Sequence, residues 1–119
     1  MEKEILVVDD QPGIRLLLQD LLVNEGYQVT IGETGKEAWD LICSHTFALA
    51  ILDYRLPVLD GAEILDRLKQ EEVDLAVILI SGMTEMLSED VIRQRNVKAV
   101  LGKPFNISDL LGQVHTILE

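Results

Sequence analysis

The sequence contains little cysteine, few cations and no long apolar segment. Cys43 is the single cysteine among 119 residues, so an internal disulfide is excluded and a reducing compartment is expected. Lysine and arginine number 10 against 21 aspartate and glutamate residues, which gives a net charge of -11. Such an acidic surface repels phosphate backbones and anionic lipids, which argues against direct binding of nucleic acid or membranes. It attracts a divalent cation or a basic partner surface instead.

The chain also lacks segments that would direct it into a membrane. No apolar run approaches the roughly 20 residues that a membrane span needs, and the opening residues Met1 to Glu4 are too charged for a signal peptide. Hydrophobic residues make up 48% of the chain, which is enough for a core at a length typical of one domain. We therefore expect a single cytoplasmic domain over residues 1–119.

Five short apolar segments alternate with stretches of helical periodicity. The segments cover residues 5–8, 27–31, 48–52, 75–80 and 97–101. Several are apolar at successive positions, as in strands that are buried on both faces. The stretches between them carry one-sided apolar stripes, of which the first comprises Ile14, Leu17, Leu18, Leu21 and Leu22. This alternation predicts an α/β fold: a doubly wound, five-stranded parallel sheet with five helices on its two faces.

Several helix boundaries are marked by residues that can cap a helix. Thr34 and Asp60 each precede a glutamate by three residues, the spacing of a capping box, and Asn106 is a further candidate N-cap. The apolar pattern is weakest over residues 84–95, where we expect a short or mobile helix. Asn96 follows this stretch and is predicted to adopt the left-handed conformation that is common at helix C-termini.

Polar side chains follow four of the five apolar segments, at the edge where parallel sheets bind ligands. They are Asp9, Asp10, Asp53, Ser81 and Lys103. Taken singly, most have an ordinary structural explanation, because aspartate caps helices and Ser-Gly or Lys-Pro pairs form turns. Asp53 is the hardest to explain in this way, since it ends the most apolar segment, where an unpaired carboxylate is costly. The joint occurrence indicates a functional site.

Three converging carboxylates must hold either a proton or a cation. Two carboxylates about 5 Å apart repel each other by roughly 3 kcal/mol at an effective dielectric constant near 20. Oxygen ligands without nearby histidine or cysteine select a hard ion, and a small site that keeps bound water suits Mg²⁺. With Lys103 and Ser81 opposite, the site can hold a phosphoryl group against a carboxylate nucleophile.

These segments resemble the receiver domain of bacterial response regulators over essentially the whole chain. The matching segments are residues 5–10 (ILVVDD), 52–61 (LDYRLPVLDG), 81–82 (SG) and 103–105 (KPF). Residues 9–15 (DDQPGIR) and 24–27 (NEGY) are similar to single-domain members that act in sporulation phosphorelays. The resemblance implies a flavodoxin-like fold and a two-component phosphoprotein, which carries a phosphoryl group rather than turning over a substrate.

The resemblance implies where the metal ion and the phosphoryl group would bind. Asp53 would be the phosphoacceptor that attacks a phosphohistidine on a partner. Asp10, Asp53 and the backbone carbonyl of Arg55 would ligate Mg²⁺, and Asp9 would act largely through water. The product would be an aspartyl phosphate, reactive enough to be passed on or hydrolysed.

The resemblance also assigns the groups that would bind the phosphoryl oxygens. They are the Ser81 hydroxyl, the Gly82 backbone N–H and the Lys103 ammonium group. The peptide bond between Lys103 and Pro104 would be cis. Arg55 and Met83, at the mouth of the site, are expected to set the lifetime of the aspartyl phosphate by controlling the access of water.

Two positions depart from the pattern of the family. Many members carry an aromatic residue three positions before the lysine, coupled to the strand-4 hydroxyl as a switch, whereas this chain has Val100. The hydroxyl itself comes from Ser81, where threonine is commoner. Both departures leave phosphoryl chemistry in place but weaken the case for conformational output, which favours a relay over a switch.

The resemblance further implies partners for a monomeric receiver: a sensor histidine kinase, a histidine phosphotransferase and a phosphatase. Family members dock a partner's helical bundle beside the acid site. The residues expected on that face are Gly13, Ile14, Leu16, Val23, Pro104 and Phe105. His45 and His115 are interpreted as ordinary surface residues rather than as a second phosphoryl carrier.

Three alternatives remain at this point. The chain could be the receiver of a larger regulator with a DNA-binding or enzymatic output module. A Mg²⁺-dependent phosphatase of the haloacid dehalogenase type is disfavoured, because residues 9–13 (DDQPG) lack the Asp-x-Asp-x-Thr pattern. A degenerate receiver that only binds partners is disfavoured by the intact acid cluster and by Lys103.

Overall fold

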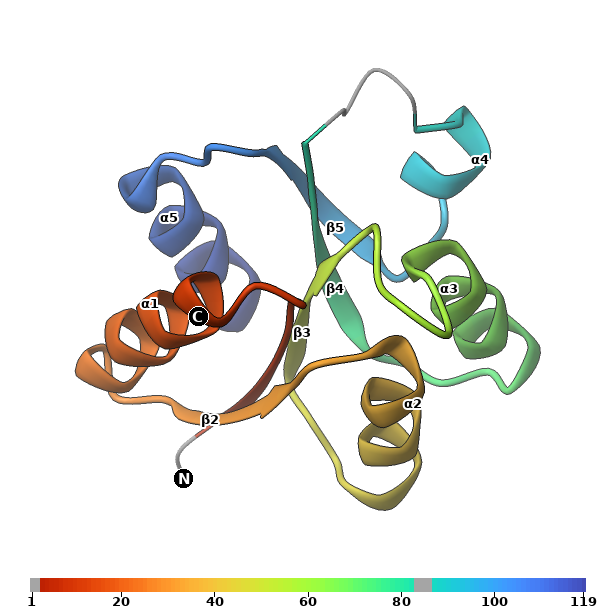
Figure 1. Ribbon diagram of the computed structural model, residues 1–119, viewed down its shortest axis with the longest axis horizontal. Helices are drawn as coiled ribbons and strands as arrows, with labels where there is room; N and C mark the ends of the chain where they lie inside the picture. Colours follow the sequence, from red (N-terminus) through yellow and green to blue (C-terminus); the bar gives the residue numbers. More distant parts are fainter. Residues whose placement is uncertain (1–2, 83–86) are drawn as a thin grey trace.

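The computed structural model describes residues 3–82 and 87–119 of the chain (Figure 1). Within these residues, five strands form one parallel sheet in the order β2-β1-β3-β4-β5. The strands are β1 (Glu4–Val8), β2 (Gln28–Gly32), β3 (Leu49–Asp53), β4 (Ala76–Ser81) and β5 (Val97–Gly102). The predicted doubly wound sheet is confirmed, and each predicted strand boundary lies within one residue of the observed one.

The helices cover both faces of the sheet. They are α1 (Pro12–Asn24), α2 (Gly35–Ser44), α3 (Gly61–Gln70), α4 (Glu89–Ile92) and α5 (Ile107–Leu118). Figure 1 shows α1 and α5 together on one face and the other helices on the opposite face. The four residues of α4 agree with the short helix predicted there. No helix in the two described ranges is long and apolar enough to cross a membrane.

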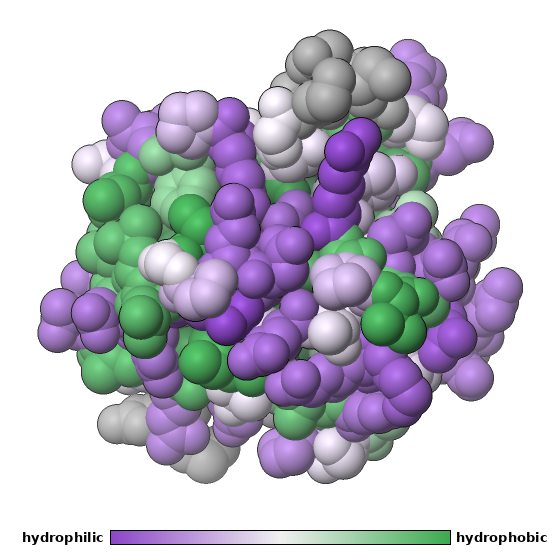
Figure 2. All heavy atoms as spheres, in the orientation of Figure 1, coloured by the Kyte–Doolittle hydropathy of each residue, from purple (hydrophilic) through white to green (hydrophobic). Residues whose placement is uncertain are grey.

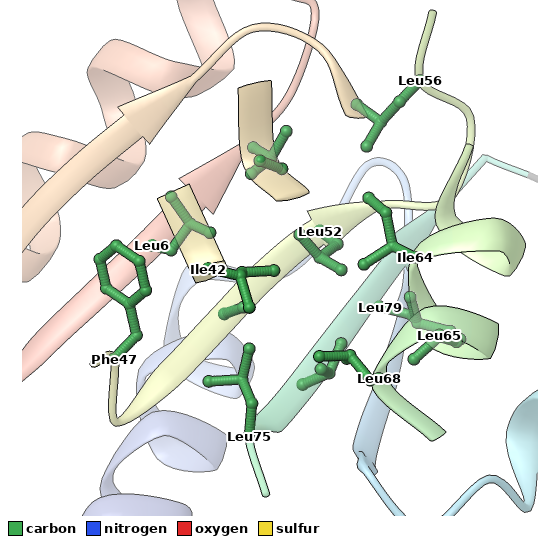
Figure 3. Close-up of a cluster of buried hydrophobic side chains, with 14 of the residues drawn as sticks. Leu6, Ile42, Phe47, Leu52, Leu56, Ile64, Leu65, Leu68, Leu75 and Leu79 are labelled. Carbon is green, nitrogen blue, oxygen red and sulfur yellow. The ribbon is translucent and has the colours of Figure 1, made fainter. Parts of the chain in front are cut away.

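Two hydrophobic cores lie on the two faces of the sheet. Leu6, Leu52 and Leu79 pack against α2 and α3 (Figure 3). Side chains alternate between the faces along a strand, so Ile51 points to the other core, under α1 and α5. Because β3 is covered on both sides, all five of its residues are buried, which explains its continuous apolar sequence. On α1, Leu17 is exposed, because it lies at the edge of the predicted stripe.

The predicted helix caps are confirmed. The Thr34 hydroxyl oxygen accepts a hydrogen bond from the Glu37 N–H at 3.1 Å, and the Asp60 carboxylate accepts one from the Glu63 N–H at 3.0 Å. The side-chain oxygen of Asn106 accepts from the Asp109 N–H at 3.1 Å. These bonds satisfy backbone donors that a helix start otherwise leaves unpaired.

The left-handed conformation predicted for Asn96 is wrong. Among the described non-glycine residues, positive φ occurs only at Val58 and Glu72. Asn96 is 3% exposed, and its side-chain N–H₂ donates to the carbonyls of Val73 at 2.9 Å and Leu75 at 2.8 Å. Long-range partners, rather than the geometry of the preceding helix, therefore select its conformation.

Two close backbone approaches hold the loop between β3 and α3. The Gly35 N–H donates to the Pro57 carbonyl at 3.3 Å, and a Cβ atom at Gly35 would lie 1.4 Å from the carbonyl oxygen of Leu59. The Gly61 N–H donates to the Tyr54 carbonyl at 2.9 Å. This packing fixes the loop that directly follows Asp53.

Candidate functional site

Strand register brings the predicted polar residues to one edge of the sheet. Val8 pairs with Leu52, so the aspartates that follow them, Asp9 and Asp53, emerge from neighbouring strands. Ser81 pairs with Gly102 at the ends of β4 and β5. These strand ends surround a cavity of about 230 Å³. Its lining residues are Asp10, Gln11, Asp53, Arg55, Ser81, Gly82 and Lys103.

The three predicted aspartates form a compact cluster. Asp9, Asp10 and Asp53 each offer a carboxylate oxygen, and these oxygens lie within 4.8 Å of one another. Asp9 and Asp53 are only 2% and 7% exposed, whereas Asp10 faces solvent. Like charges at this spacing repel strongly, so the cluster favours an added cation.

Lys103 lies on the opposite side of the buried carboxylates. Its ammonium group donates to Asp53 Oδ2 at 2.8 Å, to Asp9 Oδ2 at 2.9 Å and to Gln11 Oε1 at 3.2 Å. An ammonium group has three N–H donors, so each finds one acceptor. The peptide bond from Lys103 to Pro104 is cis, as the family resemblance implied.

The electrostatics of the cluster are unbalanced, because three carboxylates face one ammonium group. Burial raises the pKa of Asp53, and the nearby Asp9 carboxylate adds to this, although Lys103 and the Arg55 N–H act in the opposite direction. Burial disfavours the charged form of Lys103, but its bonds to Asp53 and Asp9 outweigh this and raise the Lys103 pKa. The lysine therefore stays protonated while the site retains excess negative charge.

The donor set fits a hard divalent cation. All candidate side-chain ligands are carboxylate oxygens, and the cavity is open enough to leave positions for water. Asp9 already accepts hydrogen bonds on both oxygens, from the Gln11 N–H at 2.9 Å and from Lys103. Asp53 likewise accepts on both oxygens, from the Arg55 N–H at 3.1 Å and from Lys103, so hydrogen bonding does not separate it from Asp9. Direct ligation by Asp10 and Asp53, and an indirect role for Asp9, remain predictions.

The remaining predicted site residues are placed as follows. Ser81 is buried at the end of β4, and its carbonyl accepts a hydrogen bond from the Lys103 N–H at 2.8 Å. Gly82 and Arg55 line the cavity, and the Arg55 N–H donates to Asp53 Oδ1 at 3.1 Å. Met83 lies outside the described residues. Ligation by the Arg55 carbonyl and phosphoryl binding by Ser81 and Gly82 remain predictions.

The predicted docking residues lie on the α1 side of the site. Leu16 is 60% exposed, and Val23, Gly13 and Pro104 are also exposed. Ile14 and Phe105 are half-buried against the core under α1 and α5. Figure 2 shows hydrophobic residues gathered over α1 and α5, and hydrophilic residues in the middle of the same view. Their role in docking remains a prediction.

Two residues beside the site were not predicted from the sequence. Gln11 accepts a hydrogen bond from Lys103 through its side chain, and Arg15 donates to the carbonyl of Asp9 at 2.7 Å. Gln11 directly follows the acid pair, and this position was the only available signal for it. Arg15 gave no such signal, because an arginine in the first turn of a helix usually faces solvent.

Comparisons with known proteins agree with this geometry. The family model for the response regulator receiver domain matches residues 5–115. The chain is 35% identical over 121 residues to sporulation initiation phosphotransferase F of Bacillus subtilis, which covers 99% of this chain and 95% of that protein. It is 34% identical to an uncharacterized transcriptional regulatory protein of the same organism, but spans only 53% of that protein.

A solved structure gives the same fold. The response regulator protein TrrA of Thermotoga maritima, in complex with Mg²⁺ and BeF, superposes with a TM-score of 0.86 at 33% identity, over 98% of this chain and 99% of that one. The family match, the relatives and the architecture agree. The chain belongs to the family of response regulator receiver domains.

Proposed function

We propose that this receiver domain is a Mg²⁺-dependent phosphoacceptor in which Asp53 takes a phosphoryl group from a phosphohistidine. The observation that carries the proposal is the position of Asp53. Its carboxylate is buried, accepts a hydrogen bond from the Lys103 ammonium group at 2.8 Å and is clustered with two further aspartates. A structural ion pair needs one carboxylate, whereas a site for a cation and a phosphoryl group needs the excess negative charge found here.

The transfer step follows from the positions of the side chains. A carboxylate oxygen of Asp53 attacks phosphorus, and a new P–O bond forms as the P–N bond to the histidine breaks. The electron pair of the broken bond stays on the imidazole, which leaves neutral because its second nitrogen carries a proton. Mg²⁺ held by Asp10 and Asp53 would neutralise the charge on the phosphoryl oxygens.

Lys103 binds the transferred group during this step. Its ammonium group exchanges the contact with Asp53 for a phosphoryl oxygen, while Asp9 and Gln11 keep it in place. The Ser81 hydroxyl and the Gly82 N–H bind the other phosphoryl oxygens, as the resemblance to the family implies. Loss of the group to a histidine of the next protein is the reverse of the same step.

A relay role is favoured over a conformational switch. Val100 is half-buried beside the core under α2 and α3, so no aromatic ring at this position can report on phosphorylation. The chain also spans 95% of a curated relative whose name describes a phosphotransferase of sporulation initiation. The partners in this role are a sensor histidine kinase and a histidine phosphotransferase, with a phosphatase acting on the product.

A second candidate is the receiver of a larger regulator that carries an output module. It is supported by the transcriptional regulatory relative, of which the chain spans about half. The reading frame that encodes residue 119 tests this candidate, because a DNA-binding or enzymatic module encoded beyond it would favour the second role. Phosphorylation of Asp53 is common to both candidates.

The docking proposal places the partner on the exposed side of α1. Leu16→Glu should slow transfer from a phosphorylated histidine kinase of the same genome but leave phosphorylation by acetyl phosphate unchanged, since the small donor needs no docking surface. Ile92→Glu, at an exposed residue of α4, is the matched control and should affect neither reaction. Equal transfer by wild type and Leu16→Glu would remove Leu16 from the interface.

Chemical trapping tests the central proposal. The protein is incubated with acetyl phosphate and Mg²⁺, and the acyl phosphate is reduced with borohydride and mapped by peptide mass spectrometry. The expected product is modified at Asp53, is lost in the presence of a chelator and is absent from Asp53→Asn. Asp66→Asn, at an exposed aspartate of α3, is the control and should label normally. Label that persists in Asp53→Asn would contradict the proposal.

A further inference from the structure

Arg15 makes an unusual set of contacts for an arginine in the first turn of a helix. Its side chain is only 12% exposed. Nη1 donates to the backbone carbonyl of Asp9 at 2.7 Å, and Nη2 lies 3.4 Å from the carboxylate of Glu33, which follows β2. The guanidinium group thus links α1 to the ends of both β1 and β2.

The contact with the Asp9 carbonyl bears on Asp10. This carbonyl belongs to the planar peptide group that joins Asp9 to Asp10, so holding it also holds the plane that contains the Asp10 Cα atom, from which the side chain leaves the backbone. Asp9 is fixed in other ways, through its N–H bond to the Gly32 carbonyl at 3.3 Å and through its own carboxylate.

Asp10 has none of these restraints on its side chain. Its carboxylate is exposed and has no hydrogen-bond or ion-pair partner within residues 3–82 and 87–119. Its position relative to Asp53 therefore depends on the backbone, and Arg15 is the side chain that holds this backbone from the α1 side.

We propose that Arg15 is a positioning residue for the metal site. It holds the Asp9–Asp10 peptide group so that the Asp10 carboxylate faces Asp53, and Glu33 orients the guanidinium group. The inference rests on the proposed function, which supplies the Mg²⁺ site. Residues that orient metal ligands in this way typically change metal affinity by roughly 10- to 100-fold when they are replaced.

The sign of the effect separates positioning from simple electrostatics. Arg15 is a cation near the acid cluster, so removing its charge alone would strengthen the binding of Mg²⁺. Removing a positioning contact weakens binding instead. Arg15→Met is therefore expected to weaken Mg²⁺ binding roughly 10-fold. Arg15→Lys keeps the charge without the two-pronged geometry, so it should also weaken binding. Glu33→Gln should have a smaller effect in the same direction.

The experiment is a calorimetric titration of the whole chain with Mg²⁺ alone. Arg95→Met is the matched control, because Arg95 precedes β5 and so lies at the amino ends of the strands, whereas the acid cluster lies at the carboxyl ends. Arg95 forms an exposed ion pair with Asp74 at 3.7 Å. It also removes one positive charge and should leave Mg²⁺ affinity within about twofold of wild type, because charges beyond a Debye length are screened.

A second measurement needs no metal. ¹⁵N relaxation of the Asp10 amide should show greater mobility in Arg15→Met than in wild type, while the Arg95→Met spectrum is unchanged. If Arg15→Met does not fold, Arg15→Lys carries both measurements, because it keeps the positive charge and loses only the two-pronged geometry.

The two proposals fail in different ways. Mg²⁺ binding in Arg15→Met that is equal to or tighter than in wild type, with an unchanged Asp10 amide, would overturn the positioning role and leave the proposed function intact. Absence of Mg²⁺ binding to wild type would overturn the proposed function and this inference together.

Discussion

Polar side chains are buried at both ends of the parallel strands, which we call the amino edge and the carboxyl edge of the sheet. The two sets of side chains are compensated in opposite ways. At the amino edge, Asn96 is neutral, and its amide donates to two backbone carbonyls and accepts from the Gln94 side chain at 2.8 Å. At the carboxyl edge, Asp9 and Asp53 are charged, and Lys103 is their shared cation. The first arrangement is complete within the protein, whereas the second leaves negative charge in excess.

This difference separates a structural polar group from a functional one. A buried amide with all its hydrogen bonds made stabilises one arrangement of the chain. Buried carboxylates with too few cations reduce stability, and they persist where binding or catalysis uses them. Burial of a polar residue is therefore not by itself a sign of function in this fold. Uncompensated charge is the better sign.

Mg²⁺ should give the largest change, because it completes the charge balance at the carboxyl edge only. At a concentration 100 times its dissociation constant, Mg²⁺ should raise the free energy of unfolding by about 2.7 kcal/mol. Urea unfolding with Mg²⁺ and with a chelator measures this increment. It should largely disappear in Asp10→Asn, and an increment of equal size in that variant would place the ion elsewhere.

Removing the amide at the amino edge should lower stability without affecting the metal. Asn96→Ala leaves the carbonyls of Val73 and Leu75 without their donor, and this should lower the free energy of unfolding by about 2 kcal/mol. The increment from Mg²⁺ should be the same as in wild type. A variant as stable as wild type would show that the amide bonds contribute little.

Asp53→Asn should raise the free energy of unfolding, whereas Asn96→Ala lowers it. Because the pKa of Asp53 is raised in the folded protein, its contribution to stability is favourable when it is protonated and is lost as the pH rises through the folded-state pKa. Above that pKa and without Mg²⁺ the buried carboxylate is unfavourable, so the amide should stabilise the protein by about 1 kcal/mol. Urea unfolding beside the exposed-site variant Asp66→Asn measures this, and a clear loss of stability would contradict it.

The smallest predicted effect concerns His115, outside both edges. Its two ring nitrogens lie 2.9 Å from Glu119 and 2.7 Å from Glu25, and these bonds raise its pKa. The resulting stability is fully present below the unfolded-state pKa near 6.5 and is lost as the pH rises through the higher folded value. The urea midpoint should therefore change less between pH 6 and pH 8.5 in His115→Gln than in wild type. An identical change would show that the pair is fully screened.

The sheet and the main site residues could be predicted because both follow from local sequence. Continuous apolar segments mark buried parallel strands, and parallel strands bring their carboxyl ends to one edge. Asp10, Asp53 and Lys103 each lie within two residues of the end of such a segment, so their convergence followed from the fold class alone.

The remaining features depend on contacts that the local sequence does not encode. Arg15, Asn96 and His115 owe their roles to partners on distant segments, so helix periodicity and capping patterns gave no signal or a wrong one. Val58 is a further case: it has a φ of 72° and is 77% exposed, although β-branched residues strongly disfavour positive φ. Val58 is the central residue of a three-residue turn that the Leu59 N–H closes onto the Pro57 carbonyl at 2.8 Å, a geometry that goes with positive φ.

The most direct test of the account is the binding of beryllium fluoride, a mimic of a phosphoryl group, followed by ¹⁹F NMR. The central claim is that Asp53, its neighbouring aspartates and Lys103 form one site for Mg²⁺ and a phosphoryl group. The account predicts protein-bound fluoride resonances that require Mg²⁺ and are absent from Asp53→Asn. Bound resonances that persist without Mg²⁺ or in Asp53→Asn would contradict it.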